Sequence, residues 1–239
     1  MTRLRILGIP VDAVTEAQAV QWVRVAMVGG PPRQIVTVNP EFVMRARSDP
    51  PFRAVLEAAD LAIPDGAGLL WAARRRKQVI PQRVAGVDLI HALAGEAERA
   101  GWRVFLLGAR PGVAAAAAAV LHRRHPGLII CGILAGSPSP SEDAASSAAV
   151  RAARADLLLV AFGAPAQDLW IARNLERSGA RVAMGVGGAF DFISGQARRA
   201  PAWMRRRGLE WLYRLSREPW RWRRMLALPR FVVLVLKGA

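Results

Sequence analysis

The stretch Asp156–Asp168, which reads DLLLVAFGAPAQD, decides the fold class. Its uninterrupted apolar run is typical of a strand that is buried on both faces of a parallel sheet. A Gly-Ala-Pro turn follows the run, and polar residues then open a segment of helical character. The stretch therefore predicts a strand, a loop and a helix in that order.

The same order recurs along the chain, where short apolar runs alternate with longer helical segments. This alternation predicts an α/β fold, Rossmann-like, with a mostly parallel sheet covered by helices. Thr15 is placed to cap one helix, and the alanine-rich segment after Pro111 forms another. The candidate strands are residues 4–8, 34–38, 61–63, 103–108, 128–133, 156–162 and 181–186.

Composition narrows the function classes. The chain has 239 residues and a formal net charge of +16, which indicates a polyanionic partner such as nucleic acid, an anionic membrane or a phosphorylated substrate. The single cysteine, Cys131, excludes an internal disulfide framework and fits a reducing compartment. We expect no signal peptide, and the apolar run at 231–236 is far shorter than the ~20 residues of a membrane-spanning helix.

The positive charge is concentrated near the C-terminus. Residues 196–239 contain twelve Lys or Arg against two acids, Glu210 and Glu218, and so supply +10 of the net charge. They also hold four of the eight tryptophans. We therefore predict an α/β catalytic domain over 1–195 and a basic, Trp-rich, helical, membrane-associating appendage over 196–239, which we call the tail.

Polar and glycine-rich loops follow five of the candidate strands. In a parallel sheet the carboxyl ends of the strands border the ligand crevice. Taken singly, each loop has an ordinary structural explanation, such as a helix cap at Asn39 or a tight turn at Asp65. Together they predict one site at one edge of the sheet. The loops are residues 37–40, 64–66, 108–112, 163–168 and 185–191.

The sequence predicts no metal site and no cofactor. The three histidines, at 91, 122 and 125, lack a neighbouring cluster of carboxylates or thiols, and no Asp-x-Asp pair occurs. Any bound phosphate must then be neutralised by arginine side chains and backbone amides.

Several motifs together resemble the WecG/TagA/CpsF family of bacterial glycosyltransferases. They include TVNPEFVMRARSDP at 37–50, LAIPDGAGLLW at 61–71, RVAGVDLI at 83–90 and GVGGAFDFISGQARRAP at 185–201. The resemblance covers almost the whole chain. It implies an inverting, metal-independent transfer of an N-acetylmannosamine-type sugar from a UDP donor to a polyprenyl-diphosphate-linked acceptor. The implied location is the cytoplasm, peripheral on the inner face of the bacterial cytoplasmic membrane.

The resemblance also implies roles for individual residues. Asp65 stands at the position of the catalytic base, and the chemistry agrees, since an inverting transfer needs one base for the acceptor hydroxyl. Asp191 is the runner-up base. The residues implied or expected to bind substrate are Thr37, Asn39, Arg83, Gly108, Gly163, Gln167, Gly187, Gly188, Asp191, Arg214, Arg221 and Arg224.

The arginines of the tail recur at helical spacing. Arg214, Arg217, Arg221 and Arg224 would lie along one face of a helical chain, interrupted at Pro219. Arginine suits a diphosphate because its planar fork makes paired hydrogen bonds and stays charged. Interleaved tryptophans and arginines also suit an anionic membrane surface.

The chain departs from the family pattern in two places. The family loop usually reads Gly-Ala-Pro-Lys-Gln-Glu, whereas this chain has Ala166 and Asp168, and Gly136-Ser137-Pro138 replaces a Gly-Tyr-Phe-like stretch.

Two rival functions were weighed against the glycosyltransferase. A nucleic-acid-binding protein is the main rival, but it would leave the glycine loops without a use, so we expect no nucleic-acid partner. A dinucleotide-dependent oxidoreductase is disfavoured because residues 108–112 lack the full G-x-G-x-x-G spacing. A homo-oligomer is left open.

Overall fold

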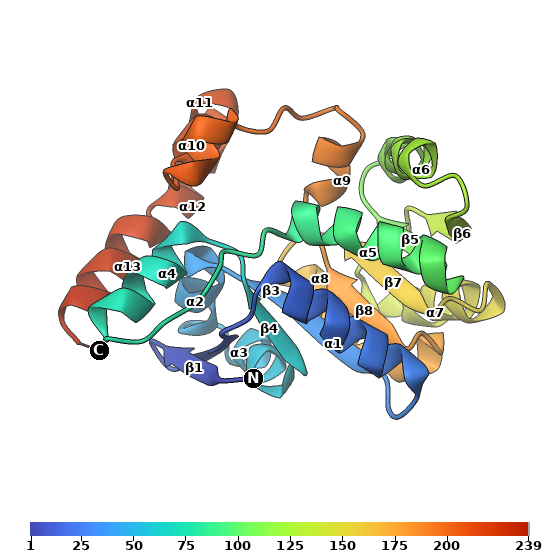
Figure 1. Cartoon of the computed structure of the whole chain (residues 1–239), viewed down its shortest axis with the longest axis horizontal. Helices are drawn as coiled ribbons and strands as arrows, with labels where there is room; N and C mark the ends of the chain where they lie inside the picture. The colour runs from blue at the N-terminus through green and yellow to red at the C-terminus, as the bar shows by residue number, and fades with distance from the viewer. Residues whose placement is uncertain (239) are drawn as a thin grey trace.

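A single six-stranded sheet forms the centre of the molecule (Figure 1). The computed structural model describes residues 1–238, except for the side chain of Arg221. All neighbouring strands in this sheet run parallel, which confirms the predicted α/β class. The order across the sheet is β4 (Leu61–Pro64), β3 (Arg33–Val38), β8 (Val182–Gly185), β7 (Leu157–Ala161), β5 (Arg103–Gly108) and β6 (Ile129–Leu134).

The first candidate strand does not join this sheet. Residues Arg3–Ile6 form β1, which pairs antiparallel with β2 (Ile9–Asp12), a strand that the apolar pattern did not separate from it. Leu7 and Gly8 both have positive φ, 49° and 86°, and so form the tight two-residue turn between β1 and β2. The buried Asp12 carboxylate accepts hydrogen bonds from Arg3 and from the Ala62 N–H at 2.7 Å, which attaches the hairpin to β4.

Helices cover both faces of the sheet. On one face α1 (Glu16–Val28), α5 (Gly86–Ala100), α6 (Val113–Arg124) and α9 (Ala189–Ile193) share a hydrophobic cluster with the strands. On the other face α7 (Asp143–Ala152) and α8 (Ala166–Ser178) pack on β5 and β7. The third cluster joins the hairpin, α2 (Pro40–Ala46), α3 (Pro50–Ala58) and α4 (Ala67–Arg75) to β3 and β4.

Local signals account for where several elements begin. Thr15 caps α1 with a complete capping box, because its side chain accepts the Gln18 N–H while the Gln18 side chain accepts the Thr15 N–H. Gly108 ends β5 with φ +96°, and a Cβ there would lie 2.8 Å from the Ala161 carbonyl carbon. The first glycine of the 108–112 loop is therefore required by the close packing of β5 against β7.

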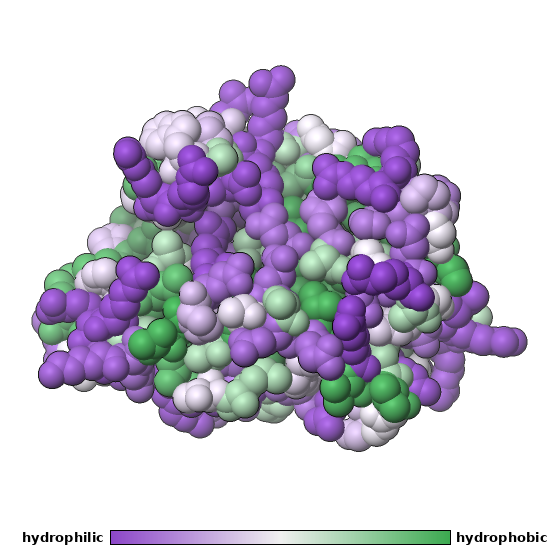
Figure 2. All heavy atoms as spheres, viewed as in Figure 1, coloured by the Kyte–Doolittle hydropathy of each residue, from purple (hydrophilic) through white to green (hydrophobic). Residues whose placement is uncertain are grey.

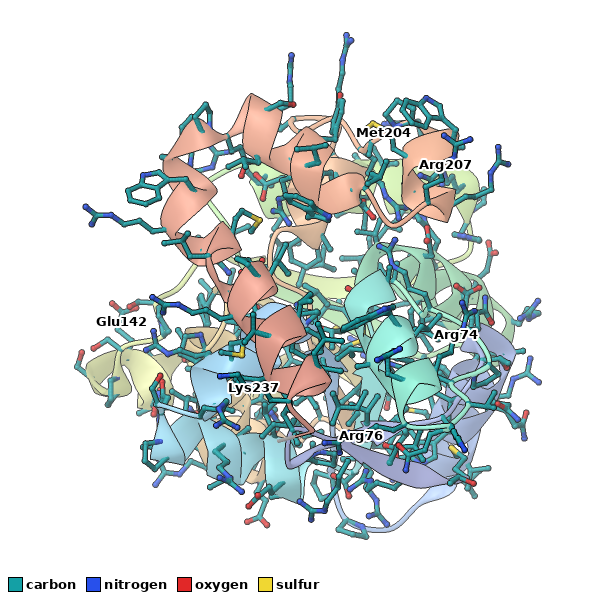
Figure 3. All side chains as sticks on the ribbon, turned by 90° about the vertical axis from the view of Figure 1, so that its left-hand side faces the viewer. Arg74, Arg76, Glu142, Met204, Arg207 and Lys237 are labelled. Atoms are coloured by element: carbon teal, nitrogen blue, oxygen red, sulfur yellow. The ribbon has the colours of Figure 1, made fainter. Side chains whose placement is uncertain are left out.

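The tail is helical and ends on the body of the protein. It contains α10 (Ala202–Arg206), α11 (Glu210–Arg217), a 3₁₀ turn at Pro219–Arg221, α12 (Trp222–Met225) and α13 (Ala227–Leu236). Phe231 and Val235 of α13 are buried in the same cluster as α2 and α4. Figure 3 shows α13 beside α4, with Lys237 and Arg76 near the lower end of the helix. The boundary at 195/196 stays a prediction, but α13 contributes to the core.

Among residues 1–238 no helix combines the length and the apolar character needed to cross a lipid bilayer.

Candidate functional site

A cleft of about 1200 Å³ lies at the carboxyl edge of the sheet. Its walls come from the loops after β3 and β4, from the start of α5, from α9 and from the tail. In Figure 1 the tail helices α10 and α11 stand over this edge, opposite α9. Of the predicted site residues, the cleft lining includes Asn39, Asp65, Arg83, Gly188, Asp191, Arg214 and Arg224.

Asp65 is held by the sheet and by the start of α5. Its N–H donates to the Val38 carbonyl at 2.7 Å, so the pairing of β4 with β3 continues into the turn. Its Oδ2 accepts the Gly86 N–H at 3.1 Å, and its Oδ1 lies 3.6 Å from Nη2 of Arg83. The side chain is 26% exposed. Burial raises the pKa of Asp65 above its ordinary value, while Arg83 and the Gly86 N–H oppose the rise. A cleft carboxylate with a raised pKa is a candidate general base.

A chain of alternating charges extends from Asp65 to the tail. Arg83 donates to Glu210 of α11 at 2.5 Å. The other oxygen of Glu210 lies 3.7 Å from Nε of Arg199, and Arg199 donates twice to Asp88, at 2.6 and 3.1 Å. Of these residues, only Asp65 and Arg83 were expected in the site from the sequence. The available signal was Glu210 itself, one of two acids in a strongly basic segment.

The residues around the Pro-Asp-Gly turn have packing roles. Asn39 caps α2, because its Oδ1 accepts the Phe42 N–H at 3.0 Å. A Cβ on Gly68 would lie 2.8 Å from Cγ of Pro40, and one on Gly66 would lie 3.0 Å from Cδ of the same ring. The two glycines therefore make room for the ring of Pro40. Both still line the cleft.

The residues that line the cleft do not include five of the predicted substrate-binding residues, which are Thr37, Gly108, Gly163, Gln167 and Gly187. Thr37 is buried and donates to the Gly185 carbonyl at 3.4 Å. Gln167 is 1% exposed, and its Oε1 accepts the N–H groups of Gly163 at 3.1 Å and Gly187 at 2.8 Å. One amide oxygen thus ties the loop after β7 to the loop after β8. Substrate contact by these five residues stays a prediction.

Asp168, one of the departures from the family pattern, is completely buried behind these loops. Burial raises the pKa of Asp168 from 3.8 to about 7, against the opposing effect of the Gln167 amide. Between about pH 4 and 7 the folded protein holds a proton on this group that the unfolded chain has released. The contribution of this group to the free energy of unfolding therefore falls as pH rises from about 4 to 7.

We expect the substitution Asp168→Asn to remove this dependence, because the amide has nearly the same shape and does not ionise. Denaturant unfolding of the variant between pH 4 and 8 should give a flatter curve than the wild type, and higher stability at pH 8. Two parallel curves would contradict the assignment of the slope to Asp168.

The rim of the cleft carries the cations. Arg110 donates to Asp191 at 2.9 Å, so the runner-up base is engaged in an exposed ion pair. Arg214 packs over the Phe192 ring at 5.1 Å, and its Nη2 lies 3.0 Å from where a Cβ on Gly188 would be. The cleft is also lined by Arg198, Arg199, Arg217 and Arg224, of which Arg224 pairs with Glu41 at 2.9 Å. The predicted contact of Arg221 lies outside the described side chains.

Within residues 1–238 no group of three or more His, Cys, Asp or Glu side chains is arranged to hold a metal ion.

The sequence matches the glycosyl transferase WecG/TagA/CpsF family over residues 4–239. It is 38% identical, over 203 residues, to the N-acetylglucosaminyldiphosphoundecaprenol N-acetyl-beta-D-mannosaminyltransferase of Bacillus spizizenii (strain ATCC 23059 / NRRL B-14472 / W23). It is 36% identical, over 203 residues, to the protein of the same name from Bacillus subtilis (strain 168). Each alignment covers 85% of this chain and 78% of the relative.

Proposed function

Because the chain belongs to the WecG/TagA/CpsF family of glycosyltransferases, we propose that it transfers an N-acetylmannosamine-type sugar from a UDP donor to a polyprenyl-diphosphate-linked acceptor. We further propose that the transfer inverts the anomeric centre and needs no metal ion. The names of the two Bacillus relatives, which specify an N-acetyl-mannosaminyltransferase and a diphosphoundecaprenol acceptor, support the sugar and the acceptor. The observation that carries the proposal is the placement of Asp65 in a cleft whose rim holds the arginines of the tail.

Asp65 acts as the base in this proposal. Its carboxylate removes the proton of the acceptor hydroxyl while the oxygen attacks the anomeric carbon, and the bond from that carbon to the diphosphate breaks. The departing diphosphate takes the electron pair and gains negative charge. Arg214, Arg217 and Arg224 line the same cleft, and their guanidinium groups stabilise that charge.

A donor panel tests the reaction. Purified protein is incubated with each of several UDP-sugars and an acceptor in which a short polyprenyl diphosphate carries GlcNAc, and the products are identified by mass spectrometry. We expect one N-acetylhexosamine to be added to the acceptor, with release of one UDP per transfer. Absence of transfer from every UDP-sugar offered, in the presence of detergent-dispersed acceptor, would overturn the proposal.

We also propose that the tail places the protein on an anionic membrane, where such an acceptor resides. Large apolar side chains are exposed on the tail, among them Trp203 at 50% and Trp222 at 53%. Arginines stack on both rings, Arg207 over Trp203 and Arg223 over Trp222. In Figure 2 pale and strongly hydrophilic spheres lie side by side at the upper left, where Figure 1 places α10 and α11. Indole rings with adjacent cations suit the headgroup region of a bilayer.

The double substitution Trp203→Ala/Trp222→Ala tests this placement, because neither ring lines the cleft. We expect partitioning into vesicles of phosphatidylglycerol and phosphatidylcholine to fall by about tenfold or more, since two interfacial apolar contacts are lost. Co-sedimentation measures the bound fraction. Val79→Ala serves as the control, because Val79 is 75% exposed on the body and should leave binding unchanged. Equal binding by the double variant and the wild type would contradict the proposal.

A further inference from the structure

Glu210 stands between two guanidinium groups above the proposed base. Its Oε2 accepts from Arg83 at 2.5 Å, and its Oε1 lies 3.7 Å from Nε of Arg199. Glu210 comes from the tail, whereas Arg83 lies in the loop before α5. Glu210 begins α11 and lies 127 residues after Arg83 in the sequence, and Figure 1 shows α11 standing over the carboxyl edge of the sheet. One tail carboxylate therefore enters the surroundings of Asp65.

Arg83 is shared unequally between two carboxylates. Its Nη2 lies 2.5 Å from Glu210 but 3.6 Å from Asp65, so the charge-assisted hydrogen bond goes to Glu210. The side chains of Arg83, Asp65 and Glu210 are 23%, 26% and 21% exposed, which limits screening by solvent. Arg83 therefore lies closer to Glu210 than to Asp65, although it remains within ion-pair distance of both.

The charges of Asp65 and of the four side chains linked to it indicate which carboxylate accepts an added proton. Three carboxyl groups, Asp65, Asp88 and Glu210, face two guanidinium groups, Arg83 and Arg199. With all five ionised the group carries one net negative charge, and a single proton makes it neutral. Asp88 accepts two hydrogen bonds from Arg199 and Glu210 accepts the short one from Arg83, which leaves Asp65 as the carboxylate with the weakest cation contact.

The groups that face Asp65 act in two directions. Burial raises the pKa of Asp65, and the negative charge of Glu210 adds to that rise. Arg83, Arg199 and the Gly86 N–H lower it. Of these groups only Glu210 belongs to a helix of the tail.

We propose that Glu210 is a positioning residue that holds Arg83 away from Asp65 and so keeps Asp65 able to accept the acceptor proton. The inference rests on the proposed function. When the acceptor O–H bond breaks, the proton moves to Asp65 and an electron pair of the acceptor oxygen forms the bond to the anomeric carbon. The bond from that carbon to the diphosphate breaks, and the diphosphate leaves with its electron pair. The charged group passes from one net negative charge to neutrality in that step. Docking of α11 thereby sets the strength of the base.

The substitution Glu210→Gln tests the coupling without substrate. The aspartate side chains are labelled with ¹³C at Cγ, and the Asp65 signal is assigned by its loss in Asp65→Asn. We expect the titration midpoint of Asp65 to fall by about one pH unit or more in Glu210→Gln, because Arg83 is released to pair with Asp65. Glu176→Gln, which makes the same change on an exposed residue of α8, should leave the midpoint unchanged.

Kinetics give a second measurement. In Glu210→Gln the acidic limb of the pH profile of kcat should shift to lower pH, and the maximal rate should fall several-fold, because a weaker base removes the proton less effectively. Glu210→Asp, which keeps the charge on a shorter side chain, should recover part of both effects. Thermal unfolding of each variant checks that the fold is retained.

The outcomes separate this inference from the proposed function. An unchanged Asp65 midpoint in folded Glu210→Gln overturns the inference, even if the wild type transfers sugar. A loss of rate with no shift of the acidic limb also overturns it, since a purely structural role predicts that result. If the Asp65 midpoint shifts in Glu210→Gln but the wild type transfers no sugar to any lipid-diphosphate acceptor, the coupling is supported and the proposed function is overturned.

Discussion

The substitution Asp65→Asn is expected to lower kcat by about 10²- to 10⁴-fold, the usual contribution of a positioned general base. An amide cannot take the acceptor proton. The fold should be retained, because the Asn oxygen can still accept the Gly86 N–H and the backbone N–H still donates to Val38. The measurement is UDP release and acceptor mass under saturating donor, with KM expected to change little since the amide fills the same space.

Asp191→Asn is the matched control for this experiment, because Asp191 lies in the same cleft and was the other candidate base. Its carboxylate is paired with Arg110. We expect the loss of kcat in Asp191→Asn to be much smaller than in Asp65→Asn. The opposite ranking would move the base to Asp191, and near-normal turnover by Asp65→Asn would remove Asp65 from the mechanism.

The second large effect is on stability, for Phe231→Ala in α13. Phe231 is 1% exposed and packs in the cluster that joins α2, α4 and the N-terminal hairpin. Its Cε1 lies 3.7 Å from where a Cβ on Gly68 would be, directly behind the Pro-Asp-Gly turn. Truncation of a buried Phe costs about 3–5 kcal/mol. At this chain length each kcal/mol corresponds to about 2–4 °C in the unfolding midpoint.

This variant also tests the predicted boundary at 195/196. If the tail and the body unfold as one unit, unfolding of Phe231→Ala remains a single transition at a lower temperature, as followed by calorimetry and circular dichroism. If the tail is a separate unit, a small early transition appears and the main one stays in place. Val233→Ala is the control, because Val233 is on the same helix and 48% exposed, so its loss should change the midpoint little.

The sequence was sufficient for the sheet but not for the hairpin. Six of the seven apolar runs are strands of one parallel sheet, since burial on both faces leaves a continuous apolar signature. The run at 4–8 has a similar composition, yet Leu7 and Gly8 turn the chain back on itself. Apolar content does not specify which partner a strand pairs with, because the register of a hairpin depends on its turn.

Within the site, the position of Asp65 at the cleft was predictable, because the end of a strand fixes it. The contacts of Gln167 and Glu210 were not predictable from the sequence. Gln167 lies in the first turn of α8, and whether such a side chain faces a cleft or braces two loops depends on the neighbouring β8 loop. Glu210 contacts Arg83, which lies 127 residues earlier in the sequence. No local sequence pattern predicts a contact between two long side chains at that separation.

One consequence of the third hydrophobic cluster concerns synthesis. It contains Leu4 and Ile6 from the first strand and Phe231 and Val235 from the last helix. The cluster is therefore complete only when the segment synthesised first contacts the segment synthesised last. Contacts between such distant segments form slowly, because a long chain must be closed before they gain any energy. The apolar surface of the earliest hairpin therefore stays uncovered during translation, and this cluster is where misassembly and chaperone capture should concentrate.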